Sequence, residues 1–235
     1  MKLLFGLVRT LLFCTILSLA FVVIPDRAIA GPVTANSEQV RAFIRHYEAT
    51  SDYDLYHPGM KRAPPRPLTQ MTVGEVMAWQ KSQGDVISTA SGAYQIIQRT
   101  LRGLVNKHGI DRNALFDRQM QDHLADLLLL ECKARRNNVV RYGNCIAYIW
   151  AALPLLSGPN TGKSAYDGIA GNRALTTTKN FMTLLQGNGG QLTQLVDGGA
   201  AVLSYRERVA QMQAEIDAER ELGQAAVWNM RTYSN

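Results

Sequence analysis

Residues 36–54 read N-S-E-Q-V-R-A-F-I-R-H-Y-E-A-T-S-D-Y-D, an amphipathic stretch that runs directly into a polar loop. Asn36 and Gln39 stand at the spacing of a capping box, which marks the start of a helix. The apolar residues that follow recur at positions i, i+3, i+4 and i+7, as Val40, Phe43, Ile44 and Tyr47. Because this spacing places them on one side of a helix, we predict a helix that is buried along that face and gives way to a loop at residue 51.

The chain after residue 30 predicts further helices, so the predicted fold class is mainly α. Thr72 and Glu75 form a second capping box, which opens a short helix. Three segments, at 51–68, 82–92 and 157–173, have the composition of loops. The other predicted helices run from Ile96 to His108, from Arg118 to about Arg135 with Asp117 as N-cap, from Asn144 to Leu153, and from Thr176 to Leu185.

The first thirty residues have the pattern of a secretory signal peptide. Lys2 and Arg9 give a positive start, residues 10–24 form a nearly continuous apolar run, and the A-I-A stretch at 28–30 is a small-x-small cleavage site. The alternative is an uncleaved membrane anchor, for which about 20 apolar residues are expected. We predict cleavage after residue 30 and export to the periplasm or the cell exterior.

The exported chain is mildly basic. The signal peptide removes three basic residues and one acidic residue, which leaves 22 basic and 18 acidic side chains and a net charge of +4. This excess suits an anionic polymer such as a bacterial cell wall, but it is too weak and dispersed to indicate nucleic-acid binding. About 205 residues remain, enough for one core and a small appendage.

Two cysteines, Cys132 and Cys145, remain in the exported chain. Disulfides persist in oxidising compartments. We therefore predict a bond between them that stabilises the fold by about 3 kcal/mol. Two buried free thiols are the alternative.

The stretch S-G-P-N-T-G-K-S at residues 157–164 ends like a phosphate-binding loop. That loop requires the spacing G-x-x-x-x-G-K-[ST], because its length wraps backbone N–H groups around the phosphates. Here only three residues separate Gly158 from Gly162, and the lead-in carries Pro154 and has the pattern of a helix end. Export also removes the supply of nucleotide, so we interpret the stretch as a loop and expect no nucleotide.

No metal or cofactor site is expected from the sequence. It contains no H-E-x-x-H or C-x-x-C motif, and Ser91 lies in no G-x-S-x-G motif. The histidines, which lack the spacing of metal ligands, are His46, His57, His108 and His123.

Residues 191–235 predict a helical extension at the C-terminus. Its apolar residues recur at spacings of three and four, as Val202, Tyr205, Val209, Met212 and Ile216. The pattern is typical of a coiled coil but extends over barely two heptads. We predict a helix that docks on the domain, with a dimer seam or a contact with a protein partner as the alternative.

Glu48 is the strongest catalytic candidate. It comes at the end of the first predicted helix, beside Tyr47 on the border of the apolar face, where the helix meets the polar loop. Partial burial and the negative end of the helix dipole both disfavour a charged carboxylate. The group is therefore expected to stay protonated near neutral pH and to donate a proton to a leaving oxygen. An ordinary glutamate at a helix end is the alternative.

Three motifs, taken in order, resemble those of a known family. They are E-A-T-S-D-Y-D at residues 48–54, S-G-A-Y-Q-I-I at residues 91–97 and C-I-A-Y-I-W-A-A-L-P at residues 145–154. Their order is similar to that in the lysozyme-like endolysins of the lambda bacteriophage type. Those proteins carry a catalytic glutamate in an S-E-G-T setting, a Y-D pair, a G-A-G-R-Y-Q motif and an N-I-W-A-S-L-P stretch. The resemblance covers about residues 40–185 with long insertions, and it departs at Ala49, in place of a glycine, and at Ala93, in place of an arginine.

The resemblance implies a lysozyme-like fold over residues 31–190 and cleavage of the β-1,4 bond between N-acetylmuramic acid and N-acetylglucosamine in peptidoglycan strands. By the same resemblance Glu48 is the general acid, Tyr94 and Gln95 match the Y-Q pair of the cleft, and Trp150 matches the tryptophan of the I-W-A segment. Tyr53 is a further candidate for substrate binding. The aromatic residues that offer flat surfaces to sugar rings are Tyr53, Tyr56, Trp79, Tyr94, Tyr148, Trp150 and Tyr166.

The sequence leaves two reactions and one non-catalytic role open. Hydrolysis by two carboxylates needs a second acid about 5–10 Å from the first. Asp52 and Asp54 are candidates for it, with Asx-type hydrogen bonding inside the loop as their alternative role. The resemblance implies a lytic transglycosylase with a single glutamate, which we favour. The rival is an inactive lysozyme-like module that binds peptidoglycan and recruits a partner through its C-terminal helix.

Overall fold

A computed structural model describes residues 31–169 and 171–187 of the chain. The predicted signal peptide and the predicted C-terminal helix lie outside these residues. Within them the fold is mainly α, as predicted, with three isolated β-bridges and no strand. The α-helices are α1 (Ser37–Ala49), α2 (Val73–Ser82), α3 (Gln98–His108), α4 (Arg118–Glu131), α5 (Val139–Ala147) and α6 (Thr178–Leu185), and the 3-10 helices are η2 (Leu68–Gln70) and η3 (Lys133–Arg135).

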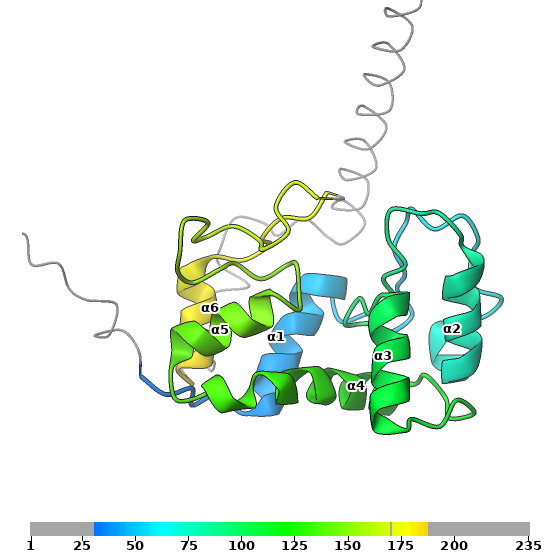
Figure 1. The fold of residues 1–235 in the computed structure, drawn as a ribbon, viewed down its shortest axis with the longest axis horizontal. Helices are drawn as coiled ribbons and strands as arrows, with labels where there is room; N and C mark the ends of the chain where they lie inside the picture. The colour runs from blue at the N-terminus through cyan, green and yellow to red at the C-terminus, as the bar shows by residue number, and fades with distance from the viewer. Residues whose placement is uncertain (1–30, 170, 188–235) are drawn as a thin grey trace, which may run out of the picture.

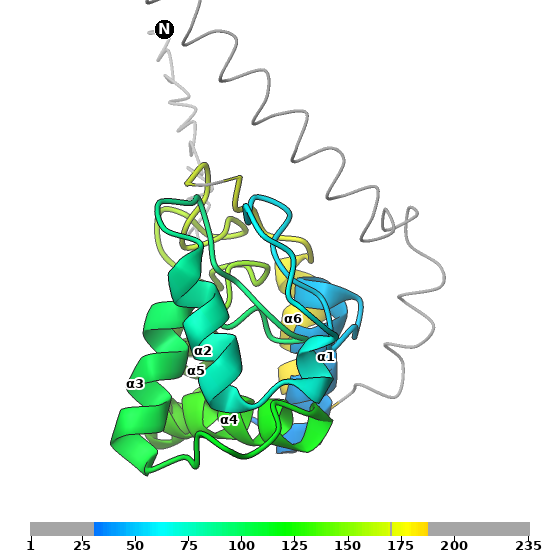
Figure 2. The same cartoon turned by 90° about the vertical axis from the view of Figure 1, so that its right-hand side faces the viewer.

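The helices form two groups that α4 connects. Helices α2 and α3 pack side by side at one end, while α1, α5 and α6 pack together at the other (Figure 1). Helix α4 runs along the base and contacts both α1 and α3, which Figure 2 shows from the side of α2 and α3. The segment between α1 and α2, residues 50–72, joins the two groups as well.

The predicted starts of α1, α2 and α4 are confirmed by their caps. Asn36 Oδ1 accepts from the backbone N–H of Gln39 at 2.9 Å, and the Gln39 side chain accepts from the Asn36 N–H at 2.9 Å. Thr72 and Glu75 make the same reciprocal pair at the start of α2. Asp117 Oδ1 accepts from Met120 N–H at 2.9 Å and caps α4. Each cap stabilises its helix by about 1 kcal/mol, because it satisfies a donor that the first turn leaves unpaired.

The predicted apolar face of α1 is buried. Val40 and Ile44 have no exposed surface, and Phe43 stacks on Phe181 of α6 with ring centroids 5.8 Å apart. Leu124 of α4 is likewise fully buried. Burial of each such side chain stabilises the fold by about 1.5–3 kcal/mol.

Several predicted helix boundaries need correction. Helices α3 and α6 begin two residues later than predicted, at Gln98 and Thr178. Helix α4 ends at Glu131, and the chain reaches Arg135 as the tighter helix η3. Helix α5 begins at Val139, because Asn138 caps it by accepting from Arg141 N–H at 3.0 Å, and it ends at Ala147 rather than at residue 153.

After the end of α5, two backbone groups that would pair in a longer helix make tertiary hydrogen bonds instead. If the helix continued, the N–H of Ala152 would bond to the carbonyl of Tyr148. Instead, the Ala152 N–H donates to Glu48 at 3.0 Å, and the Tyr148 carbonyl accepts from the hydroxyl of Tyr166 at 2.6 Å. These contacts connect the end of α5 to the cavity described below.

The predicted disulfide is present. Cys132 and Cys145 are joined with an S–S distance of 2.04 Å. Cys132 is the C-cap of α4 and Cys145 lies in α5, so the bond holds the end of one helix against the next.

Residues 157–164 form a loop, as predicted. The Leu155 N–H donates to the Lys163 carbonyl at 2.8 Å, and the Gly162 N–H donates to the Leu155 carbonyl at 2.9 Å. These bonds close a tight turn, and turns rather than a helix follow Lys163, unlike a phosphate-binding loop. Across the part of the chain that the structure describes, no helix has the length and apolar character needed to span a bilayer.

Candidate active site

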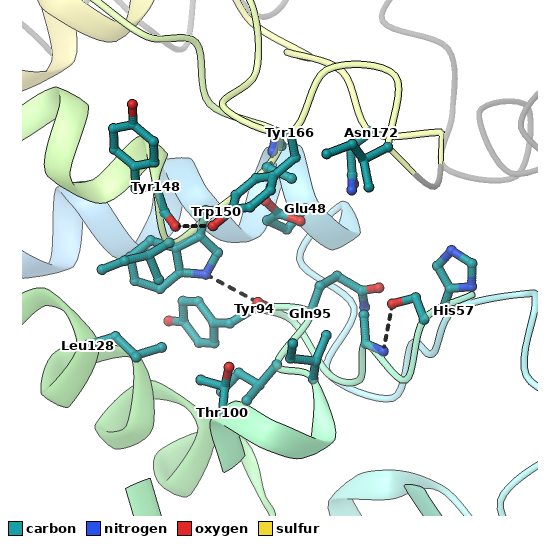
Figure 3. A pocket seen from close by; sticks show the side chains of 18 of the residues that line it. Glu48, His57, Tyr94, Gln95, Thr100, Leu128, Tyr148, Trp150, Tyr166 and Asn172 are labelled. Carbon is teal, nitrogen blue, oxygen red and sulfur yellow. Dashed lines mark hydrogen bonds between the residues drawn. The ribbon is translucent and has the colours of Figure 1, made fainter. Parts of the chain in front are cut away.

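A cavity of about 730 Å³ lies between the two groups of helices. It is bounded by the end of α1, residues 87–97, helix α3, the last turns of α4, and the loops 148–152 and 166–175. Figure 3 shows side chains from these segments turned toward a shared space. Of the residues predicted from sequence, those that line it are Glu48, Tyr94, Gln95 and Trp150.

Glu48 lies in the last turn of α1 and is half-buried. The helix ends just after it, because Thr50 and Ser51 adopt left-handed backbone conformations with φ of 49° and 62°. One carboxylate oxygen, Oε1, accepts a hydrogen bond of 3.0 Å from the backbone N–H of Ala152. Glu48 is thus held at the wall of the cavity by a backbone donor that is distant in the sequence.

Trp150 and Tyr94 connect two further motifs in the wall of the cavity. The indole Nε1 of Trp150 donates to the backbone carbonyl of Tyr94 at 3.2 Å (Figure 3). Both side chains are almost completely buried. A buried donor and a buried acceptor that pair in this way are costly to separate, so the bond holds the two segments together.

Gln95 follows a tight turn at residues 91–94 and has a left-handed backbone with φ of 46°. Such a conformation in a residue other than glycine costs about 1–3 kcal/mol and is common at functional sites. The Gln95 side chain donates from Nε2 to the Gly92 carbonyl at 2.9 Å.

Gln121 of α4, which the sequence did not single out, supports this turn. It is fully buried, accepts from the Ala93 N–H at 2.9 Å, and donates to the carbonyls of Tyr53 and Phe116 at 3.0 and 2.9 Å. Gly92 packs so closely that a Cβ there would lie 2.2 Å from Gln121 Oε1. The only signal in the sequence that could have identified Gln121 was its position, because it is a polar residue on the apolar face of a predicted helix.

The other three predicted site residues lie elsewhere. Asp52, Asp54 and Tyr53 do not line the cavity with Glu48 but a separate hollow of about 440 Å³. Asp52 Oδ1 accepts from the Asp54 N–H at 2.9 Å, and Asp54 Oδ1 accepts from the Thr69 N–H at 2.7 Å. Asp52 therefore makes the Asx-type loop contact that was its alternative role, whereas Asp54 connects the loop to the 3-10 helix η2.

Tyr53 instead belongs to a polar network on α4. Its hydroxyl donates to Asp122 Oδ1 at 2.8 Å, and the Tyr94 hydroxyl donates to the same oxygen at 2.5 Å. Arg45 of α1 donates to the Tyr94 hydroxyl at 2.9 Å. Burial, followed by the bond to Asp122, raises the pKa of Tyr53 to about 12. The network directs the Tyr94 hydroxyl to α4 and leaves its ring against the cavity.

Two exposed tyrosines border the cavity and add to the predicted set. Tyr148 is 59% exposed, and Tyr166 is bonded to it through the carbonyl described above. Figure 3 shows both on the side of the cavity that carries Trp150. The sequence identified them only as aromatic residues, and the position of Tyr148 two residues before Trp150 was the available signal. Exposed aromatic rings at a cavity rim suit stacking on sugar rings.

The cavity contains few charged groups. Among its described lining residues the carboxylates are Glu48 and Glu131, and Glu131 pairs with Lys107 at 2.9 Å. Within residues 31–169 and 171–187, no group of three His, Cys, Asp or Glu side chains is placed to hold a metal ion. The arrangement can present one carboxyl group, aromatic faces and amide groups to a bound polymer.

Comparison with protein-family models, curated proteins and solved structures finds no match to this chain.

Proposed function

We propose that the chain cleaves the β-1,4 bond between N-acetylmuramic acid and N-acetylglucosamine in peptidoglycan, with Glu48 as general acid and a lysozyme-like fold. The observation that carries the proposal is the convergence of three motifs that are far apart in sequence. Ala152 bonds to Glu48 and Trp150 bonds to Tyr94, so all three motifs border one cavity. If the three motifs resembled the family only by chance, there would be no reason for them to meet at one cavity.

The reaction favoured is that of a lytic transglycosylase. Glu48 protonates the oxygen that leaves the anomeric carbon, and the bond between them breaks. The substrate's N-acetyl group shields the anomeric carbon meanwhile. The Glu48 carboxylate then takes the proton of the 6-hydroxyl, whose oxygen closes the anhydro ring. The proton balance is complete without water or a second carboxylate.

The charges of the cavity support this choice over two-carboxylate hydrolysis. Asp52 and Asp54 line the other hollow, and the second glutamate of the cavity, Glu131, is paired with Lys107. A hydrolase of the two-carboxylate type would need one of these groups across the glycosidic bond from Glu48.

Digestion of purified peptidoglycan by residues 31–235 tests the proposal, with products identified by mass spectrometry. We expect anhydro-muropeptides from the unaltered chain and none from Glu48→Gln. Reducing-end products would establish hydrolysis instead. If both proteins bind the wall and neither yields products, the inactive binding module would be the correct role.

A further inference from the structure

His57 lies in the wall of the cavity but has no place in the reaction described above. Its side chain is only 8% exposed, and it lines the same cavity as Glu48 and Gln95 (Figure 3). The backbone holds it there, because the His57 N–H donates to the Ala90 carbonyl at 2.9 Å. The imidazole is therefore presented to the cavity by a paired segment of backbone.

The hydrogen bond at one ring nitrogen determines where the proton sits. His57 Nδ1 accepts from the backbone N–H of Gly59 at 3.0 Å, so Nδ1 carries no proton. Burial lowers the pKa of His57, which keeps the ring neutral near neutral pH. A neutral imidazole has one proton for its two nitrogens, and that proton must be on Nε2.

Nε2 is therefore a hydrogen-bond donor without a partner among the described residues. A donor in the wall of a cavity that bonds to no protein group is available to a ligand that enters the cavity. We propose that the Nε2–H of His57 donates to the carbonyl oxygen of an acetamido group of the bound glycan. The inference rests on the proposed function, since it takes a glycan as the ligand.

The neighbours of His57 favour an acetamido group over the other acceptors of a glycan. A neutral donor pairs best with a strong neutral acceptor, and an amide carbonyl is a stronger acceptor than a sugar hydroxyl or ring ether. Ala90, bonded to the backbone of His57, and Ile87 line the same cavity and offer apolar contact to the acetyl methyl group. The Nε2–H donor matches the carbonyl oxygen of an acetamido group, and the apolar surface matches its methyl group.

A pair of substitutions separates binding from structure. In His57→Asn, the asparagine oxygen can replace the Nδ1 acceptor, but no donor reaches the position of Nε2. In His57→Gln, the amide N–H reaches the position of Nε2, but the Nδ1 acceptor is lost. Each is made with Glu48→Gln, which keeps the oxygen that accepts from Ala152, so that binding is measured without cleavage. The probe is soluble uncrosslinked glycan strands from peptidoglycan, and thermal unfolding of each variant is measured beside the titration.

We expect His57→Asn to weaken binding about three- to tenfold, the range for one hydrogen bond between neutral groups. We expect His57→Gln to bind within about twofold of the parent but to unfold at a lower temperature, because Gly59 loses its acceptor. With de-N-acetylated strands the parent and His57→Asn should bind equally. Unchanged affinity in His57→Asn, or the same loss with both kinds of strand, would overturn the assignment.

An NMR measurement on the unaltered chain tests the tautomer without any variant. The ¹⁵N shifts of His57 should show the proton on Nε2, and the Nε2–H resonance should move when N-acetylated strands are added. A proton on Nδ1 would overturn the inference even if the chain cleaves glycan. Absence of both glycan binding and cleavage would instead be a failure of the proposed function, and the inference would fall with it.

Discussion

The backbone N–H of Ala152 donates a hydrogen bond to Glu48 Oε1 at 3.0 Å, across 104 positions of the chain. The bond joins the last turn of α1 to the segment where α5 has ended. It fixes the orientation of the carboxyl group at the cavity, and it diverts the Ala152 N–H from the Tyr148 carbonyl that it would meet if α5 continued. The candidate acid and the non-helical segment beside it therefore depend on each other.

Glu48→Gln should reduce the initial rate of peptidoglycan cleavage by about 10²–10⁴, the usual contribution of a general acid. Stability should change little, because the amide oxygen of glutamine can still accept from Ala152. Turnover is measured by release of soluble muropeptides, and unfolding by circular dichroism in urea.

The matched control for this change is Glu131→Gln. It removes the other glutamate of the cavity, which is exposed and paired with Lys107. We expect its rate to stay within about tenfold of the unaltered chain, since exposed ion pairs contribute about 0–1 kcal/mol. Equal losses from both substitutions would argue against a special role for Glu48.

Trp150→Phe should lower both stability and activity. It leaves the buried Tyr94 carbonyl without its indole donor, a loss of about 1–3 kcal/mol in the free energy of unfolding. Trp79→Phe is the comparison, because Trp79 also donates to a carbonyl, that of Arg62 at 3.0 Å, but lies outside the cavity. Urea unfolding should show a loss of stability in both variants. The cleavage rate, measured where both variants are folded, should fall only in Trp150→Phe.

Gly92→Ala should destabilise the turn before Gln95 by more than about 2 kcal/mol. Gly92 has φ of 76°, and the added Cβ would lie 2.2 Å from Gln121 Oε1. Gly103→Ala is the control, because Gly103 lies inside α3 with nothing within 4 Å of the added Cβ. It should stabilise the chain by about 0.5–1 kcal/mol through helix propensity. Thermal unfolding of the two variants should thus shift in opposite directions.

Replacement of Cys132 and Cys145 by serine should destabilise the fold by about 3 kcal/mol. The bond closes a loop with a sequence separation of 13, and its loss increases the entropy of the unfolded chain. Dithiothreitol should reproduce the loss in the unaltered chain and have no effect on the double variant. A reduced chain as stable as the oxidised one would contradict this account.

The stability of the chain should fall as the pH drops below 6.5, in part because of His57. Burial lowers the pKa of His57 in the folded state below its ordinary value of 6.5. The contribution of the neutral ring is complete above pH 6.5 and is lost as the pH falls from there through the folded pKa, because the unfolded chain binds the proton first. Urea midpoints measured from pH 8 to 5 should decline less in His57→Asn than in the unaltered chain.

The local features of this protein could be predicted from neighbouring residues in the chain. Capping pairs such as Asn36 with Gln39 act within one turn, and apolar spacing along α1 reports burial directly, so both could be predicted from neighbouring residues. The disulfide followed from the number of cysteines in a chain predicted to be exported. The convergence of Glu48, Tyr94 and Trp150 on one cavity was expected only from a resemblance, because no local signal reports which distant segments meet.

Which candidates share the cavity could not be predicted, because it depends on contacts between distant segments. Tyr53 is an aromatic residue of the kind that lines a sugar-binding cleft, but its hydroxyl is bonded to Asp122 on α4. Asp52 bonds within its loop, and Asp54 bonds to Thr69 of η2. The donor to Glu48 and the donor state of His57 were equally hidden. They depend on hydrogen bonds from Ala152 and Gly59 that helix propensity and residue type do not encode. Hydrogen bonds between distant segments compete with local preferences, and only the folded chain shows which of them form.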